Sequence, residues 1–219
     1  MASEQYGRTK RTRLKREPGR ANYDREAVHA VLDAGLLAHV GYVIDGTPYV
    51  TPTAYWRDGD IIYWHGAAAG RMLKHQREGV DVCVTVSHFD GLVLARSAFH
   101  HSANYRSVMA FGRCELVDDP DEKMRQLEIF MERMAPGRSQ EARMPSPREM
   151  RLTSVLALPL EEVVLKSRSG PPVDDDEDMK LDVWAGVLPI ETKVGAPQDD
   201  PKLRAGIKRP KGLRKLQTN

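Results

Sequence analysis

The sequence predicts a mainly β protein in which about six antiparallel strands form a closed or partly closed barrel with few flanking helices. Two tight turns separate its first apolar runs. Asp45-Gly46 is a strong hairpin signal, and residues 57–60 contain a second turn at Gly59. Residues 80–86 then alternate apolar and polar side chains, as a half-buried strand does. Because tight turns join strands that run in opposite directions, these runs favour an antiparallel meander over a parallel β-α-β unit.

The first elements follow from local signals. Asp24 is placed to cap a helix whose apolar side chains share one face, and Gly35 ends that helix. Pro48 and Pro52 are expected to interrupt the second strand, because proline has no N–H to give to a sheet. The predicted strands cover residues 36–44, 47–56, 61–65, 80–86, 92–99, 108–117 and 153–166.

The later elements are predicted in the same way. Phe89-Asp90-Gly91 predicts a turn between two strands, and residues 100–107 read as a polar connection before the next strand. Residues 121–134 have the apolar period of an amphipathic helix. Ser146 followed by Pro147 predicts the start of one more helix.

Composition limits the class of protein. Hydrophobic residues make up 41% of the 219 and charged residues 29%, and no run approaches the roughly 18 apolar residues that span a bilayer. Residues 1–20 are basic with no apolar run behind them, so we expect no secretory signal there. Cys83 and Cys114 both lie in apolar, strand-like runs and are expected to be buried free thiols. We therefore expect a cytoplasmic protein with no membrane span and no metal site.

Charge divides the chain into three parts. The net charge of +2 hides +5 on residues 1–20 and +7 on residues 202–219, so the rest holds 19 bases against 29 acids, a net of −10. We predict a basic N-terminal extension (residues 1–21), a cofactor-binding domain (22–190) and a basic C-terminal tail (191–219). The ends could rest on the acidic body or on a partner, or could bind nucleic acid. Apart from Tyr6 they lack aromatic residues for base stacking, so nucleic acid is not the expected partner.

Residues 61–75 form the stretch most suggestive of chemistry. An apolar strand ends at Gly66, and small residues lead into a predicted helix over residues 66–79. Arg71 and Lys74 are three apart and so share one helix face. Small residues and cations at a helix start favour a phosphate-binding site. The glycine spacing matches neither the Walker nor the dinucleotide motif, and a plain connection with solvated cations remains the alternative.

Three short motifs occur in a characteristic order: Thr51-Pro52-Thr53, the run from Tyr63 to Lys74, and the run from Asn104 to Gly112. Together they resemble the pyridoxamine 5′-phosphate oxidase-like family, and within it the nitroimidazole-resistance-type flavin-binding proteins. The resemblance covers about residues 24–184. It implies a six-stranded antiparallel split β-barrel, a homodimer with FMN in a cleft at the subunit interface, and oxidoreductase activity on a small molecule, with nitroaromatic reduction one possibility. The family's C-terminal Arg-containing signature is absent, which argues against vitamin B6 oxidation.

The resemblance also implies roles for individual residues. The strand Val50-Thr51-Pro52-Thr53 would lie beside the flavin, and His65-Gly66 with Arg71 and Lys74 would meet its ribityl chain and phosphate. The remaining expected cofactor contacts are Tyr105, Arg106, Ser107 and Trp184, with Trp184 covering the flavin from its own or the partner subunit. His65 is the candidate catalytic residue.

Alternatives stay open at several of these positions. His65 could be a structural histidine, residues 105–107 a polar bulge, and Trp184 a buried or interface residue without a ligand. The cofactor could instead be a deazaflavin or haem, and the protein could be a flavin carrier without catalysis.

Overall fold

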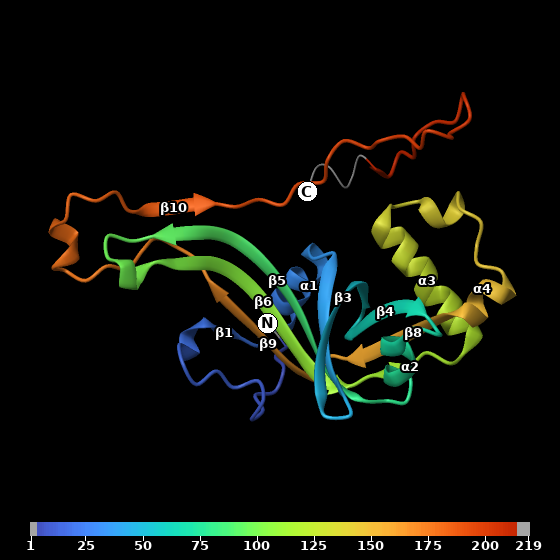
Figure 1. Cartoon of the computed structure of the whole chain (residues 1–219), viewed down its shortest axis with the longest axis horizontal. Coiled ribbons are helices and arrows are strands. Elements are labelled where there is room, and N and C mark those ends of the chain that lie inside the picture. The colour runs from blue at the N-terminus through green and yellow to red at the C-terminus, as the bar shows by residue number, and fades with distance from the viewer. Residues whose placement is uncertain (1–3, 214–219) are drawn as a thin grey trace.

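The computed structural model describes residues 4–213, in which one ten-stranded antiparallel sheet curls into an open barrel (Figure 1). The strand order is β1-β9-β6-β5-β2-β3-β4-β8-β7, and β10 pairs with β5 beside this path. The strands are β1 (Ala21–Asn22), β2 (Leu37–Ile44), β3 (Thr47–Asp58), β4 (Ile61–Ala67), β5 (Asp81–Leu94), β6 (Ser102–Arg113), β7 (Glu115–Leu116), β8 (Thr153–Pro159), β9 (Glu162–Arg168) and β10 (Gly186–Pro189). The end strands β1 and β7 do not pair with each other within the described residues, so the fold is a split barrel, with more strands than the six expected.

Four α-helices accompany the sheet among the described residues. They are α1 (Arg25–Ala34), α2 (Arg71–Gln76), α3 (Pro120–Met134) and α4 (Pro147–Leu152). The helix starts are as predicted: the Asp24 carboxylate accepts a hydrogen bond from the Ala27 N–H at 2.8 Å, and Ser146 and Glu149 form a capping box. The hairpin between β2 and β3 turns at Asp45 (φ 49°) and Gly46 (φ 76°), both in the left-handed region that such a turn requires.

The structure corrects the predicted strand boundaries in the second half of the sheet. The expected turn at residues 89–91 is an irregularity within the single long strand β5, where pairing with β6 shifts between Phe89 and Gly91. A local bulge accommodates these turn-forming residues without reversing the direction of the chain. Residues 102–107, expected in a connection, therefore belong to β6, which is the strand that returns along β5.

Three further predictions were wrong in extent. Pro48 and Pro52 do not interrupt β3, because they lie where β2 is the pairing neighbour and β4 pairs only from Tyr55 onward. Residues 153–166 form two strands, β8 and β9, which pair with different parts of the sheet. The helix expected over residues 66–79 is the six-residue α2.

The main apolar core is built from alternate residues of the strands, and the buried residues of α1 pack into it. A second cluster lies between α3 and the outer side of β3, β4 and β8, and its buried members are Trp56, Tyr63, Leu127 and Val155. Cys114 is buried and Cys83 half-buried, and both are free thiols as predicted. Within residues 4–213 no helix combines the length and apolar character needed to cross a membrane.

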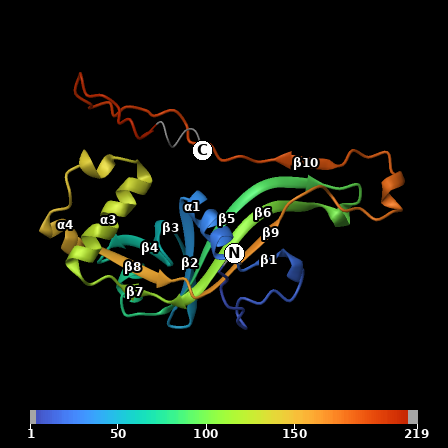
Figure 2. The ribbon, with the colours of Figure 1, turned by 180° about the vertical axis from the view of Figure 1, so that it is seen from behind.

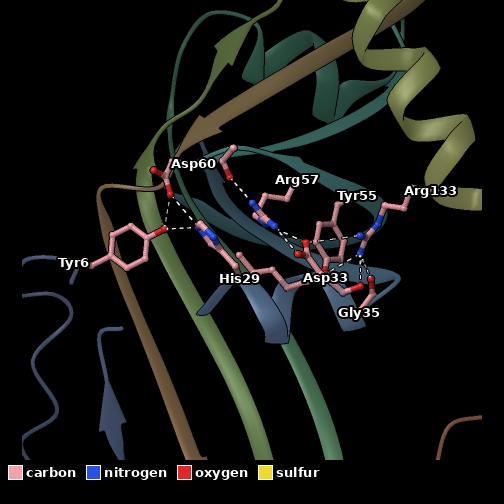
Figure 3. A network of polar contacts seen from close by, with 10 residues as sticks. Tyr6, His29, Asp33, Gly35, Tyr55, Arg57, Asp60 and Arg133 are labelled. Atoms are coloured by element: carbon pink, nitrogen blue, oxygen red, sulfur yellow. Dashed lines mark hydrogen bonds and ion pairs between the residues drawn. The ribbon is translucent and has the colours of Figure 1, made fainter. Parts of the chain in front are cut away.

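The described part of the N-terminal segment packs against the barrel from Tyr6 onward. Tyr6 is 4% exposed and Thr12 is fully buried. The Tyr6 hydroxyl lies 2.9 Å from His29 Nε2 and donates to Asp60 at 2.9 Å, which links the segment to α1 and to the turn between β3 and β4 (Figure 3). Arg133 of α3 donates to the carbonyl of Leu32 at 3.1 Å in the neighbouring part of this network.

The long β5–β6 hairpin extends beyond the barrel as an arm, with β10 along its edge (Figures 1 and 2). β10 pairs with the outer half of β5 from Leu94 to Gly91. α3 and α4 lie at the opposite end of the molecule from this arm. The arm therefore stands apart from the helices that cover β4.

Candidate functional site

The outer face of β2 and β3 is an exposed apolar surface. Along β3 the side chains alternate, so Thr51 and Thr53 are half-buried while Val50 and Pro52 are exposed, Val50 to 67%. The facing residues of β2 contribute Leu37, Val43 and the exposed His39, and His39 lies directly opposite Pro52. The strand Val50-Thr51-Pro52-Thr53 is thus divided between the two faces of the sheet.

His65 lies on β4, facing the second apolar cluster. Its ring is packed between Trp56 of β3, with centroids 5.8 Å apart, and Phe130 of α3, with centroids 4.7 Å apart in an edge-to-face arrangement. Its Nδ1 is buried and has no hydrogen-bond partner among residues 4–213. Burial lowers the pKa of His65 below the ordinary value, so the ring is neutral near pH 7. A neutral imidazole with an unused nitrogen is the form in which histidine binds metals.

Arg71 and Lys74 lie on α2, both exposed, and neither pairs with a carboxylate in the described part of the chain. The Arg71 guanidinium lies 4.5 Å from the centre of the Tyr49 ring, which stacks on Tyr42 with centroids 5.6 Å apart. The Tyr42 hydroxyl is 3.0 Å from Thr51 Oγ1. This chain of contacts connects Arg71, one of the two cations predicted to hold a phosphate, with Thr51 on the neighbouring hairpin.

The connection between β4 and α2 is tightly packed. A Cβ at Gly66 would lie 2.9 Å from Leu73 Cδ2, and a Cβ at Gly70 would lie 3.0 Å from the Ala67 carbonyl oxygen. Glycine at both positions is explained by the close seating of α2 on β4. Because α2 has only six residues, its dipole is short, and the attraction for an anion here comes mainly from Arg71 and Lys74.

Tyr105, Arg106 and Ser107 lie on β6 rather than near α2. Arg106 forms a two-bond ion pair with Asp90, at 2.9 Å and 2.7 Å, and this pair lowers the pKa of Asp90. Ser107 Oγ lies 2.9 Å from Ser87 Oγ across the strand pair. Arg106 also lines a cleft of about 600 Å³ that the C-terminal segment around residues 190–194 helps to form. The polar groups of Arg106 and Ser107 are thus satisfied within the chain.

Trp184 lies on the arm, just before β10. It is 63% exposed, and its ring packs over Gly186, where a Cβ would lie 2.7 Å from Trp184 Cζ2. Within residues 4–213 its indole forms no hydrogen bond and no ring contact with the other predicted site residues. Val183 beside it and Leu188 on β10 are also exposed, so the arm presents apolar side chains to its surroundings.

Several residues at the site were not predicted. Tyr42 lies three positions before Asp45, and Tyr49 lies three positions after Gly46. The predicted turn therefore already implied that these two tyrosines face each other across the hairpin. The placement of Trp56 and Phe130 around His65 had no such signal, because it depends on where α3 packs on the sheet. His39 was also missed, although alternation along β2 places it on the exposed face.

Comparison with known proteins agrees with the fold and the motifs. The profile of the pyridoxamine 5′-phosphate oxidase family matches residues 24–167. The structure of the flavocytochrome Anf3 from Azotobacter vinelandii is 44% identical, with a TM-score of 0.91 over 95% of this chain and 97% of that one. The structure of an FAD and haem binding protein from Mycobacterium smegmatis is 36% identical, with a TM-score of 0.87 over 90% and 97% of the two chains.

A putative 5-nitroimidazole antibiotic resistance protein from Bacteroides thetaiotaomicron is more distant. It is 23% identical with a TM-score of 0.56 over 67% of this chain and 85% of that one, which shows a shared fold. Among curated protein sequences nothing matches. The profile match over most of the barrel, and two solved relatives that align along nearly their whole lengths, place the chain in the pyridoxamine 5′-phosphate oxidase family.

Proposed function

We propose that this protein is a redox protein that binds a flavin and a haem and works as a homodimer. The two solved relatives above 30% identity are described as a flavocytochrome and as an FAD and haem binding protein. The observation in this chain that carries the proposal is the state of His65, which is held by two aromatic rings, neutral, and unpaired at a buried nitrogen within the described residues.

His65 fits the role of an axial haem ligand. Within residues 4–213 the buried Nδ1 forms no hydrogen bond, which is costly in a folded chain, and coordination to haem iron would give the imidazole a partner. The ring packs between Trp56 and Phe130, which fixes its orientation. The exposed apolar residues Val50 and Leu37 offer surface for a flat apolar macrocycle. His39 is exposed on the same face of the sheet as Val50 and Leu37, but no hydrogen bond or ring contact from residues 4–213 fixes its ring. We therefore propose His65 rather than His39 as the haem ligand.

The region of Arg71 and Lys74 fits the phosphate of a flavin. Two cations three residues apart, without carboxylate partners in the described chain, can each form charge-assisted hydrogen bonds with phosphate oxygens. Thr51, tied to Arg71 through Tyr42 and Tyr49, places a hydroxyl near the same region. When bound, a flavin supplies hydride chemistry and a haem supplies one-electron chemistry. The protein's own residues bind and orient the two groups.

The dimer supplies a reason for the exposed apolar surfaces. Val50 and Leu37 on the barrel, and Trp184 and Leu188 on the arm, lie on two separated parts of one chain. A two-fold partner would bury both, because each arm would reach the barrel of the other subunit. In that arrangement Trp184 would approach the partner's cofactor, which is the role expected for it from the sequence. Sedimentation equilibrium should give twice the chain mass of 24.6 kDa, and a Trp184→Ala chain should dissociate more readily.

The identity of the cofactors can be tested directly. The purified protein should show both flavin and haem absorbance, and released flavin should be identified by chromatography. We propose FAD rather than the FMN expected from the sequence, because the 36% identical relative is described as binding FAD. Recovery of flavin without haem would reject the haem part of the proposal. A deazaflavin in place of the flavin would reject the flavin part, and no chromophore at all would reject both parts.

The proposal includes oxidoreductase activity on a small-molecule substrate. Reduction of a nitroaromatic compound, suggested by the sequence motifs, can be assayed with chemically reduced protein in single-turnover experiments. Reoxidation of the flavin by the nitro compound faster than in its absence would support this substrate class. A bound flavin that no acceptor reoxidises would favour the non-catalytic carrier.

A further inference from the structure

The N-terminal segment borders a hollow that is lined by none of the residues assigned above to haem or to the flavin phosphate. Its volume is about 840 Å³, within the usual range of small-molecule sites. The charged residues that line it are Arg8, Lys10, Arg13 and Lys15, and no carboxylate of residues 4–213 lines it. The hollow is therefore strongly positive in a molecule whose net charge is only +2.

The loop that carries these cations is anchored. Thr12 is fully buried, its carbonyl accepts a hydrogen bond from Tyr23 at 2.9 Å, and its hydroxyl accepts one from the Thr9 N–H at 2.9 Å. Arg11 donates to both carboxylate oxygens of Glu162, at 2.7 Å and 2.9 Å. The loop is thus held to β9 by Arg11, while its neighbours Lys10 and Arg13 face the hollow.

The four cations lack the carboxylate partners that several arginines elsewhere in the described chain have. Arg57 pairs with Asp33, Arg96 with Asp174 and Arg106 with Asp90. Within residues 4–213 none of the four around the hollow forms an ion pair. Arg8 is placed over the ring of Tyr23, 4.9 Å from its centre. Four like charges around one hollow repel each other, and a polyanion bound between them would relieve that repulsion.

We propose that this hollow binds the phosphate groups of a nucleotide. Arginine and lysine together recognise phosphate through charge-assisted hydrogen bonds. Leu14, Pro18 and Ala21 give the same hollow an apolar wall, which a bare inorganic ion would not need. The nucleotide is either a separate ligand or the nucleotide half of the flavin itself. As a site for a separate nucleotide it goes beyond the proposed function, and as a site for the flavin's nucleotide it rests on that function. Phosphate binding at these cations can be measured whether or not haem is present.

The test is calorimetric titration of the full-length protein, as purified, with ADP, pyrophosphate and adenosine at low salt. ADP and pyrophosphate should bind saturably, one per chain, and adenosine should not. Lys10→Ala with Arg13→Ala should weaken ADP binding at least about tenfold, because two charge-assisted contacts are lost. The matched control is Arg16→Ala with Arg20→Ala, which removes the same charge from the same segment outside the hollow. The control should bind ADP within about twofold of the native chain.

The two sources of the nucleotide give different results. A separate nucleotide binds to the protein as purified, and the Lys10→Ala/Arg13→Ala chain keeps its flavin. If the hollow instead holds the flavin's own nucleotide, the purified protein has no free ADP site and gains one only after the flavin is removed. In that case the Lys10→Ala/Arg13→Ala chain retains FMN better than FAD. Absence of ADP binding in both forms overturns the proposal. Equal losses in the two double variants, or binding of DNA in place of ADP, would show nonspecific attraction by the tail and overturn it as well.

Discussion

The β4–α2 region and the β5–β6 region differ in what their polar side chains do. At β4 and α2, His65 has a buried nitrogen without a partner in the described chain, and Arg71 and Lys74 have no carboxylate there. At β5 and β6, Arg106 donates two hydrogen bonds to Asp90, and Ser107 is paired with Ser87. Folded chains rarely leave buried polar groups unsatisfied without a functional reason. His65 has such a group, whereas Arg71 and Lys74 are exposed cations. The difference supports the proposal that ligands bind at β4 and α2, while the polar residues of β5 and β6 pair within the sheet.

The largest expected effect is the loss of haem from a His65→Ala chain. Removing the axial ligand should leave the purified protein almost without haem while its flavin content stays near one per chain. Haem is measured as the pyridine haemochrome and folding by circular dichroism. His39→Ala is the matched control, because His39 lies on the exposed face of the neighbouring hairpin. If the His39 variant loses haem and the His65 variant keeps it, the assignment is wrong.

The next largest effect concerns the flavin phosphate. Arg71→Ala with Lys74→Ala should weaken flavin binding by about 3 kcal/mol or more, since two charge-assisted contacts of about 1.5–3 kcal/mol each are lost. Titration of flavin-free protein measures the affinity. Arg148→Ala with Arg151→Ala is the control, because these cations are also three apart on a six-residue helix, α4. If the Arg71→Ala/Lys74→Ala chain binds flavin with unchanged affinity, Arg71 and Lys74 do not bind the flavin phosphate.

A smaller effect is expected at β6. Arg106→Ala should lower the free energy of unfolding by about 0–1 kcal/mol, the usual value for a partly exposed ion pair, and should leave flavin affinity almost unchanged. Urea denaturation and the same flavin titration give the two numbers. A loss of flavin affinity as large as that of the α2 variant would erase the contrast between the two regions. It would restore Arg106 to the cofactor contacts expected from the sequence.

The smallest expected effect is a dependence of stability on pH. Because burial lowers the pKa of His65 in the folded chain, the unfolded chain binds its proton more readily. The free energy of unfolding of cofactor-free protein should therefore fall as the pH drops below about 6.5 and level off below the folded pKa. Urea denaturation at neutral and mildly acidic pH should show a steeper fall for the native chain than for His65→Gln. Equal slopes would show that His65 is not held neutral by burial.

The sequence determined the parts of the fold that depend on neighbouring residues. Asp45-Gly46 set the β2–β3 hairpin, and Asp24 and Ser146 set two helix starts, because turn and cap chemistry acts over about four residues. The order of the motifs around Thr51, His65 and residues 104–112 was also enough to indicate the family, which the comparisons confirm.

Only the tertiary structure decided which distant groups meet. Phe130 packs on His65, Asp90 pairs with Arg106 and Thr12 anchors the N-terminal segment through Tyr23. Each of these contacts joins residues that are not neighbours in the sequence. The segment Phe89-Asp90-Gly91 has the residues of a turn, yet it continues as a bulged strand because β6 and β10 pair on both sides of it. Turn propensity is a local preference worth little free energy, and two flanking strands with many backbone hydrogen bonds outweigh it.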